Sequence, residues 1–177
     1  MIKTATINVR GLNSIKCQYL RETVRINEID ICFLQETHIK DKDEIQVFNN
    51  ILVDFLTLFT TNTIKTRGVG ILVKKSTGFK ISNMYKDFNS RVLGCEINIK
   101  GYILNFINIY SPNTVFEQCE FVEYLYDLIN TKKYIYLCGD FNFVESEKDR
   151  SNIKKNMNNW DLKKKIKFGM GFLKISI

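Results

Sequence analysis

Residues 134–142 read YIYLCGDFN, an apolar run that ends in Gly139, Asp140 and Asn142. A short apolar run that meets a glycine is typical of a buried strand ending in a turn. Asp140 and Asn142 stand at i and i+2, so their side chains can point the same way from an extended segment. A carboxylate and an amide there can orient a water and donate to a phosphate oxygen. The alternative is an Asp-containing turn after a strand.

Three other apolar runs end in polar motifs in the same way. They are Asn8-Val9-Arg10-Gly11, Leu34-Gln35-Glu36-Thr37 and Tyr110-Ser111-Pro112-Asn113. Glu36 follows an apolar strand, and a carboxylate at a strand end is a natural ligand for Mg²⁺, although taken alone it can be a surface glutamate. Strand ends at one edge of a sheet bring ligand-binding groups together, so the four motifs indicate one phosphodiester-cleaving site.

The remaining polar candidates also have plain structural explanations. The Asn8 amide can donate to phosphate or hold a neighbouring carboxylate, but an asparagine near a glycine often makes only a turn. The Tyr110 hydroxyl and the Asn113 amide can face one cleft, and the alternative is a strand-end tyrosine followed by a proline turn. Arg91 can touch a DNA phosphate, and a solvated arginine explains it about as well.

Strand-like and helix-like segments alternate in an order that sets the fold class. Hydrophobic periodicity predicts helices over 15–29 and 116–129, and strands over 2–9, 29–34, 53–59, 69–73, 79–85, 92–99, 102–110 and 134–138. The opening is β-α-β, and the middle is a run of antiparallel strands separated by glycine-containing turns. We therefore expect an α/β (α+β) protein built as a two-sheet β-sandwich flanked by helices.

Composition bounds the number of domains and the cellular setting. A chain of 177 residues with 45% hydrophobic residues suits one well-buried domain. The five cysteines form no CxxC pair, which favours reduced thiols in an intracellular protein. No run approaches the roughly 20 apolar residues that span a bilayer, and the first residues lack the order of a signal peptide, so no membrane association is expected.

The net charge of +7 is concentrated in one part of the chain. Residues 148–177 hold nine basic and two acidic residues, whereas residues 1–147 are neutral overall. A charge run of this kind is more often a solvated end than a specific binding face. The high pI is therefore weak support for a nucleic-acid partner.

Taken in order, the motifs resemble the endonuclease/exonuclease/phosphatase family, most closely the apurinic-endonuclease-like endonuclease domains of non-long-terminal-repeat (LINE-type) retrotransposons. The resemblance runs from about residue 2 to residue 151. It is carried by TINVRGL (6–12), ICFLQETH (31–38), RGVGILV (67–73), NIYSPN (108–113), GDFNFV (139–144) and Asp149-Arg150-Ser151. The fold that this resemblance implies is a four-layer αββα sandwich.

The resemblance also implies a DNA-nicking hydrolase with one Mg²⁺ or Mn²⁺ site, active in the nucleus, from an element that can include a reverse transcriptase. The residues it assigns to catalysis are Asn8, Glu36, Tyr110, Asp140 and Asn142. Glu36 would bind the metal with support from Asn8, and Asp140 would orient or activate the attacking water. Tyr110 and Asn142 would stabilise the charged phosphate. Asn113 would contact the DNA backbone, as Arg91 can.

One part of the family pattern is missing from this sequence. The family carries a Ser-x-x-Asp-type motif and then a Ser-Asp-His motif downstream of GDFN, and that histidine is the general base or electrostatic partner of the water. Neither motif stands well downstream of GDFN in this sequence. The single histidine, His38, directly follows the Glu36 strand, where a packing or hydrogen-bonding role suits it better.

These observations predict a C-terminally truncated family domain over 1–151, incomplete in its final strands, followed by a basic, non-homologous tail over 152–177. Three functions stay open. The first is a retrotransposon endonuclease, possible in active or inactive form. The second is a non-catalytic remnant with at most affinity for the phosphate backbone. The third is a phosphatase or phosphodiesterase acting on another phosphate ester, because one scaffold can serve several substrates.

Overall fold

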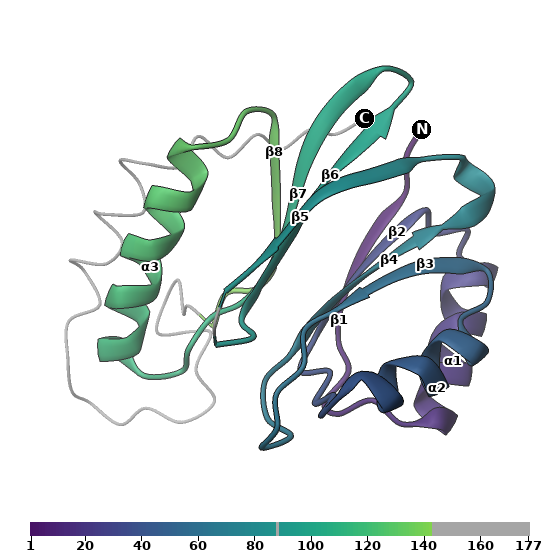
Figure 1. Ribbon diagram of the computed structural model, residues 1–177, viewed down its shortest axis with the longest axis horizontal. Helices are drawn as coiled ribbons and strands as arrows, with labels where there is room; N and C mark the ends of the chain where they lie inside the picture. The colour runs from purple at the N-terminus through teal and green to yellow at the C-terminus, as the bar shows by residue number, and fades with distance from the viewer. Residues whose placement is uncertain (88, 143–177) are drawn as a thin grey trace, which may run out of the picture. The chain divides into compact units, whose positions relative to one another are not determined.

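The computed structural model describes residues 1–87 and 89–142, which form two units. The first unit, 1–110 with 133–140, contains the two sheets and helices α1 and α2 (Figure 1). The second unit, 111–132 with 141–142, contains helix α3 (Val115–Asn130). Within the described part of the chain, no helix has the length and apolar character needed to cross a bilayer.

The first sheet has the strand order β1-β2-β4-β3. Its strands are β1 (Thr4–Asn8), β2 (Ile31–Gln35), β3 (Phe55–Phe59) and β4 (Val69–Lys74). Helix α1 (Ser14–Ile26) connects β1 to β2, so these two strands run parallel, whereas β4 is antiparallel to β2 and to β3. Parallel strands end at the same edge of a sheet, and the register places Asn8 beside Gln35.

The second sheet has the strand order β5-β6-β7-β8. Its strands are β5 (Lys80–Lys86), β6 (Val92–Ile99), β7 (Tyr102–Tyr110) and β8 (Ile135–Asp140). The first three strands form an antiparallel meander, and β8 runs parallel to β7. Tyr110 and Asp140 are partners in this parallel pair, so the two strands end side by side.

Strand β2 is buried on both faces and forms the centre of the first unit. Cys32 and Leu34 belong to a core cluster with residues of α1 and α2, which cover one face of the first sheet (Figure 1). Phe33 points the other way and stacks on Phe106 and Tyr136 of the second sheet, with ring centroids 6.1 and 5.9 Å apart. The predicted two-sheet sandwich with flanking helices is therefore confirmed. The Asp149-Arg150-Ser151 motif and the tail over 152–177 lie outside the described residues.

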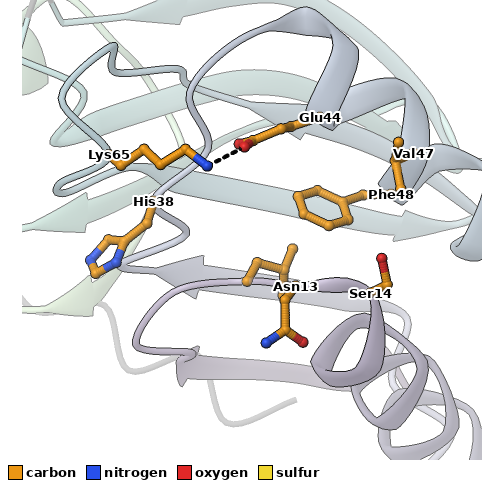
Figure 2. Close-up of a pocket in the computed structure, with 8 residues that line it drawn as sticks. Asn13, Ser14, His38, Glu44, Val47, Phe48 and Lys65 are labelled. Atoms are coloured by element: carbon orange, nitrogen blue, oxygen red, sulfur yellow. Dashed lines mark hydrogen bonds and ion pairs between the residues drawn. The ribbon is translucent and has the colours of Figure 1, made fainter.

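Helix α2 (Lys42–Ile51) is absent from the sequence prediction. Asp41 caps it, and one carboxylate oxygen accepts from the backbone N–H groups of Asp43 and Glu44, both at 3.1 Å. Glu44 also accepts from the Lys65 ammonium at 2.5 Å (Figure 2). Phe48 is the one buried residue of α2, so the apolar stripe is too narrow to give a clear helical period.

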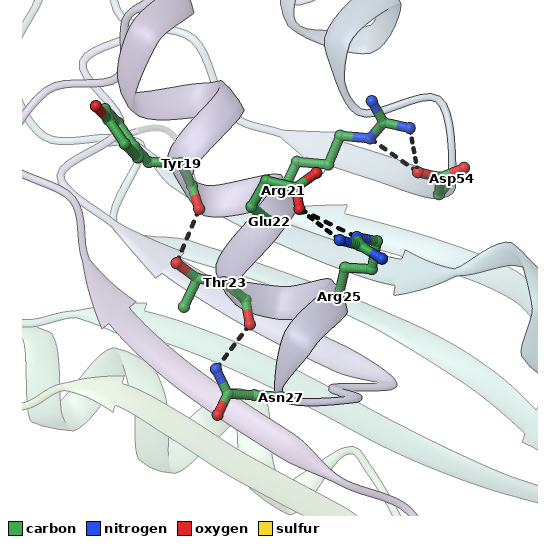
Figure 3. Close-up of polar contacts among 7 residues, drawn as sticks. All are labelled: Tyr19, Arg21, Glu22, Thr23, Arg25, Asn27 and Asp54. Atoms are coloured by element: carbon green, nitrogen blue, oxygen red, sulfur yellow. Dashed lines mark hydrogen bonds and ion pairs between the residues drawn. The ribbon is translucent and has the colours of Figure 1, made fainter.

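Helix α1 carries a row of polar contacts on its solvent-exposed side (Figure 3). The Arg21 guanidinium donates twice to one carboxylate oxygen of Asp54, at 2.8 and 2.6 Å, and so ties α1 to the turn before β3. Arg25 pairs with Glu22 one turn earlier, at 2.8 Å. Exposed ion pairs contribute little to stability, so burial of apolar side chains stabilises α1 more than these contacts do.

The five cysteines are all free, and they differ strongly in exposure. Cys32 and Cys95 are fully buried, and burial raises the pKa of each thiol to about 12. Burial also raises the pKa of Cys17 to about 11. Cys119, on α3, is exposed.

A thiol-reactive disulfide such as Ellman's reagent should therefore find one fast site in the native protein. We expect Cys119 to react rapidly near neutral pH and the buried thiols only after denaturant is added, because the thiolate is the reactive form. Cys119→Ser should remove the fast phase. Rapid native labelling of Cys32 or Cys95, located by mass spectrometry, would contradict the buried core described above.

Candidate active site

The ends of four strands, two from each sheet, meet at one point. The side-chain amide of Asn8, at the end of β1, donates to Glu36 Oε1 at 2.8 Å and to Asp140 Oδ2 at 3.0 Å. Glu36 directly follows β2, and Asp140 ends β8. One amide group of the first sheet therefore holds a carboxylate from each sheet. The structure brings Asn8, Glu36 and Asp140 together.

The orientation of the Asn8 amide follows from the loop after β1. The backbone N–H of Arg10 donates to Asn8 Oδ1 at 3.1 Å, which leaves the amide nitrogen to face the two carboxylates. The ammonium of Lys16, on α1, donates to the carbonyl oxygens of Val9, Arg10 and Gly11 at 3.1, 2.8 and 2.9 Å. Lys16 was missed at the sequence level because a helical lysine usually indicates a solvated surface.

Glu36 has a backbone conformation that non-glycine residues rarely adopt, with φ of +54°. Hydrogen bonds with the loops after β1 and before β4 hold it there: Gly11 N–H donates to the Glu36 carbonyl at 2.7 Å, and Thr37 N–H donates to the Gly68 carbonyl at 3.0 Å. Such a conformation costs on the order of 1–3 kcal/mol and persists only where the surroundings impose it. The strand therefore breaks at the residue whose carboxylate faces Asn8.

Tyr110, at the end of β7, lies against the same carboxylates. Burial raises the pKa of its hydroxyl above the ordinary 10.0, as do the negative charge of Glu36, a hydrogen bond with Glu36 and, more weakly, the charge of Asp140. The nearby Arg91 cation opposes this rise. A raised pKa favours the protonated phenol, so Tyr110 keeps a proton to donate at neutral pH.

Arg91 packs against the Tyr110 ring. Its side chain is buried, with 9% of the residue exposed, so the interpretation as a solvated arginine is wrong. The guanidinium carbon lies 5.3 Å from the centroid of the Tyr110 ring, and one guanidinium nitrogen donates to the Tyr110 carbonyl at 3.2 Å. A cation over an aromatic face is favourable, so Arg91 fixes the orientation of this ring.

Gly139 allows β8 to reach the site. Its φ is +135°, and a Cβ atom there would lie 2.0 Å from the carbonyl oxygen of Ile109 on β7. A side chain at this position would collide with backbone, which cannot move aside as a flexible side chain can. The glycine of the GDFN motif therefore brings Asp140 beside Tyr110.

Two further predicted residues belong to the second unit. Asn142 has a φ of +48°, and its side-chain amide donates to the Ser111 carbonyl at 2.7 Å. Gln118, on α3, donates to the carbonyls of Pro112 and Asn142 at 2.8 and 3.2 Å. Asn113 is exposed. The phosphate contact expected of Asn142 and the DNA contacts expected of Asn113 and Arg91 stay predictions.

The donor set around Asn8 fits a hard divalent cation. Two carboxylates that share one amide are close enough for their like charges to repel, and a cation between them would offset that repulsion. Mg²⁺ is usually bound by one or two carboxylates together with waters and substrate phosphates. Over residues 1–87 and 89–142, no three side chains of His, Cys, Asp or Glu are grouped to hold a metal.

His38 lies near Glu36 and lines a separate pocket. Its Nε2 atom is 3.8 Å from Glu36 Oε2, and its ring lies against Gly11, where an added Cβ atom would be 3.1 Å from Nδ1. His38 also lines an open pocket of about 440 Å³ (Figure 2). The other lining residues are Leu12, Asn13, Ser14, Glu44, Val47, Phe48 and Lys65. The packing role expected of His38 agrees with its contact with Gly11.

The sequence and the fold correspond to a known family. Residues 5–173 match the Endonuclease/Exonuclease/phosphatase family, so the chain belongs to that family. An AP endonuclease from Archaeoglobus fulgidus has the same fold, with a TM-score of 0.65 and 19% identity over 83% of this chain and 60% of that one. TDP2 from D. rerio, solved with a single strand DNA product, also has this fold. Its TM-score is 0.62 and its identity 17%, over 81% of this chain and 62% of that one.

A transposon protein is among the relatives of this sequence. The uncharacterized 149 kDa protein of transposon TX1 from Xenopus laevis is 25% identical over 158 residues, which cover 87% of this chain and 12% of that protein. The chain therefore spans a small part of the transposon protein and about three fifths of the two structures. The resemblance to the family and to transposon proteins is confirmed.

The steric argument at Gly139 can be tested by stability measurements. We expect Gly139→Ala to lower the free energy of unfolding by about 3 kcal/mol or more, because it adds a backbone collision to a strained φ. Gly78→Ala is the matched control, since Gly78 also has a positive φ but nothing lies within 4 Å of its added Cβ. Gly78→Ala should lower the free energy of unfolding by only about 1 kcal/mol. Equal losses in urea unfolding would show that β8 does not approach β7 as closely as described.

Proposed function

We propose that this chain is a metal-dependent phosphodiester hydrolase, the DNA-nicking endonuclease of a retrotransposon. The observation that carries the proposal is the pair of hydrogen bonds from the Asn8 amide to Glu36 and Asp140, which collects two carboxylates from different sheets at one point. Membership of the Endonuclease/Exonuclease/phosphatase family supports hydrolysis of a phosphate ester. The transposon relative supports DNA as the substrate.

In this proposal Glu36 is the main protein ligand of a Mg²⁺ or Mn²⁺ ion, and Asn8 supports the site by fixing both carboxylates. When bound, the ion supplies positive charge to the non-bridging and leaving oxygens of the phosphate. The Asp140 carboxylate accepts a hydrogen bond from the attacking water and so orients it for in-line attack. The same carboxylate can activate that water by accepting its proton as it attacks.

Four other residues have roles in this proposal. The Tyr110 hydroxyl donates to a phosphate oxygen, and its raised pKa keeps that proton in place. By resemblance to the family, Asn142 is proposed to donate to a phosphate oxygen and Asn113 to contact the DNA backbone. Arg91 acts through Tyr110, because its guanidinium already lies over the tyrosine ring. In the transposon setting the chain would work on nuclear DNA with a reverse transcriptase of the same element.

Supercoiled plasmid provides the direct test of this function. We expect the wild-type chain to convert it to the nicked form in Mg²⁺ or Mn²⁺, and EDTA to stop the reaction. Glu36→Gln and Asp140→Asn should each lower the rate on the order of 100-fold or more, as the loss of one stabilising group in an active site typically does. Asp54→Asn is the matched control, because Asp54 is a half-exposed carboxylate on the turn before β3 that pairs with Arg21.

Two outcomes would replace the proposal with another function. DNA binding that needs no divalent ion, weakens with salt and produces no nicks would indicate a non-catalytic remnant. Hydrolysis of a small phosphate ester in Mg²⁺ without plasmid nicking would indicate a phosphatase or phosphodiesterase with another substrate.

The protonation state of Tyr110 gives an independent prediction. Burial and the negative Glu36 favour the neutral phenol, so this tyrosine should lose its proton only above pH 10, the ordinary value. Phenolate absorbance is measured against pH for wild type and for Tyr110→Phe. Subtracting the second curve from the first leaves the titration of Tyr110, and its midpoint should lie above pH 10. Glu36→Gln should move it back toward 10. A midpoint below 10 would mean that Tyr110 does not face the carboxylates, and Tyr110→Phe would then leave the nicking rate unchanged instead of lowering it about 100-fold.

A further inference from the structure

A buried asparagine of the second sheet reaches across the sandwich to the first. Asn108, on β7, is 0% exposed. Its side-chain amide donates to the carbonyls of Leu34 on β2 and Gly70 on β4, both at 2.8 Å. Leu34 and Gly70 are register partners in the first sheet. One side chain of β7 thus holds two neighbouring strands of the opposing sheet.

Gln35 extends this contact to a fourth strand. It is 2% exposed, and its amide donates to Asn108 Oδ1 at 2.7 Å and to the Thr6 hydroxyl on β1 at 3.0 Å. The Thr6 hydroxyl can return a hydrogen bond to Gln35 Oε1 at 3.2 Å. The inter-sheet bridge, defined here as Asn108, Gln35 and Thr6, therefore connects β7, β2, β4 and β1.

Stability alone does not explain this bridge. Buried polar groups are costly unless each finds a partner, and a polar pair can often be replaced by apolar side chains of similar shape with little loss. Hydrophobic contacts are not directional, so the apolar core between the sheets resists sliding only weakly. Hydrogen bonds are directional, so the bridge fixes how the sheets are registered on each other.

Each residue of the bridge stands one or two positions before a residue of the candidate active site in the sequence. Gln35 is the residue before Glu36, and Asn108 stands two residues before Tyr110 on β7. The partner of Asn108 on β8 is Cys138, two residues before Asp140. The site takes Glu36 from the first sheet and the Tyr110–Asp140 pair from the second, so its internal spacing depends on how the two sheets are registered.

We infer that Asn108 is a positioning residue that, through the inter-sheet bridge, sets the distance between Glu36 and the Tyr110–Asp140 pair. Its effect on catalysis rests on the proposed function, whereas its effect on the site geometry does not. Asn108 touches neither carboxylate through any contact described above. It acts through the backbone of β2 and β4 and through Gln35.

The chain offers a matched control at the far end of the same strands. Thr4 on β1 and Tyr136 on β8 also form a hydrogen bond between the sheets, with their hydroxyl oxygens 2.8 Å apart. Each lies four residues before the site residue on its strand, Asn8 or Asp140. Tyr136→Phe removes one inter-sheet hydrogen bond, as a change at Asn108 does, but well away from the site.

The experiment compares Asn108→Leu, Tyr136→Phe and wild type with two readouts. The first is the exchange with water of the Asn8 side-chain amide protons, followed by NMR and assigned with Asn8→Ala. The second is the plasmid-nicking rate at saturating Mg²⁺. We expect Asn108→Leu to speed the exchange about tenfold or more and to lower kcat on the order of 100-fold with a smaller effect on KM, because small misplacements of catalytic groups have effects of this size. Tyr136→Phe should match wild type in both readouts.

A second variant separates positioning from stability. Asn108→Leu/Gln35→Met replaces both amides with apolar groups, so Gln35 no longer lacks its partner and part of the stability that Asn108→Leu loses should return. The double variant is also the fallback if Asn108→Leu does not fold. Its kcat should stay low and its Asn8 exchange fast. Recovery of wild-type values in the double variant, or wild-type values in Asn108→Leu, would overturn the inference. If wild type does not nick DNA, the proposed function fails, and the Asn8 exchange rates still decide whether Asn108 positions the site.

Discussion

Two carboxylates meet in this protein because one amide group donates a hydrogen bond to each of them. Asn8 stands at the end of β1 and receives Glu36 from β2 and Asp140 from β8. Like charges at this spacing oppose folding unless donors or a cation accompany them. The parallel pairs β1–β2 and β7–β8 bring the Asn8 donor to both carboxylates, because the last residues of each pair are in register at the site.

The backbone around these carboxylates departs from regular strand geometry. Glu36 and Arg10 have φ values of +54° and +47°, and Gly139 has a φ of +135° that brings β8 against Ile109. Hydrogen bonds from Lys16 and from Gly11 hold the first two in place. Unfavourable conformations that neighbouring elements impose are characteristic of functional sites, where geometry takes precedence over stability.

Part of this architecture was predictable from the order of residue types. Asn8, Tyr110 and Asp140 each end an apolar run, so strand periodicity alone located them at strand termini. The residues that support them were not predictable in this way. The sequence around Arg91 would look the same whether the side chain is solvated or lies over Tyr110. Asn108 occupies an alternating strand, where the sequence carries no sign of a partner on the opposite sheet.

Helix α2 and the second unit mark two further limits of sequence-based inference. The Lys42–Ile51 helix buries one residue, so its cap at Asp41 was a stronger signal than its hydrophobic period. Asn142 follows Asp140 by two residues, and an extended chain would point both side chains the same way. Its φ of +48° breaks that alternation, because Asn142 instead donates to Ser111 within the second unit.

In the proposed function, Glu36 binds one divalent cation and Asp140 lies beside it to orient the attacking water. Crystals soaked in Mn²⁺ and measured for anomalous scattering would test it most directly, since the ion is located without reference to activity. We expect one strong peak beside Glu36 and within the reach of Asp140, and we expect Glu36→Gln to abolish it. A peak elsewhere, with both carboxylates unliganded, would contradict it.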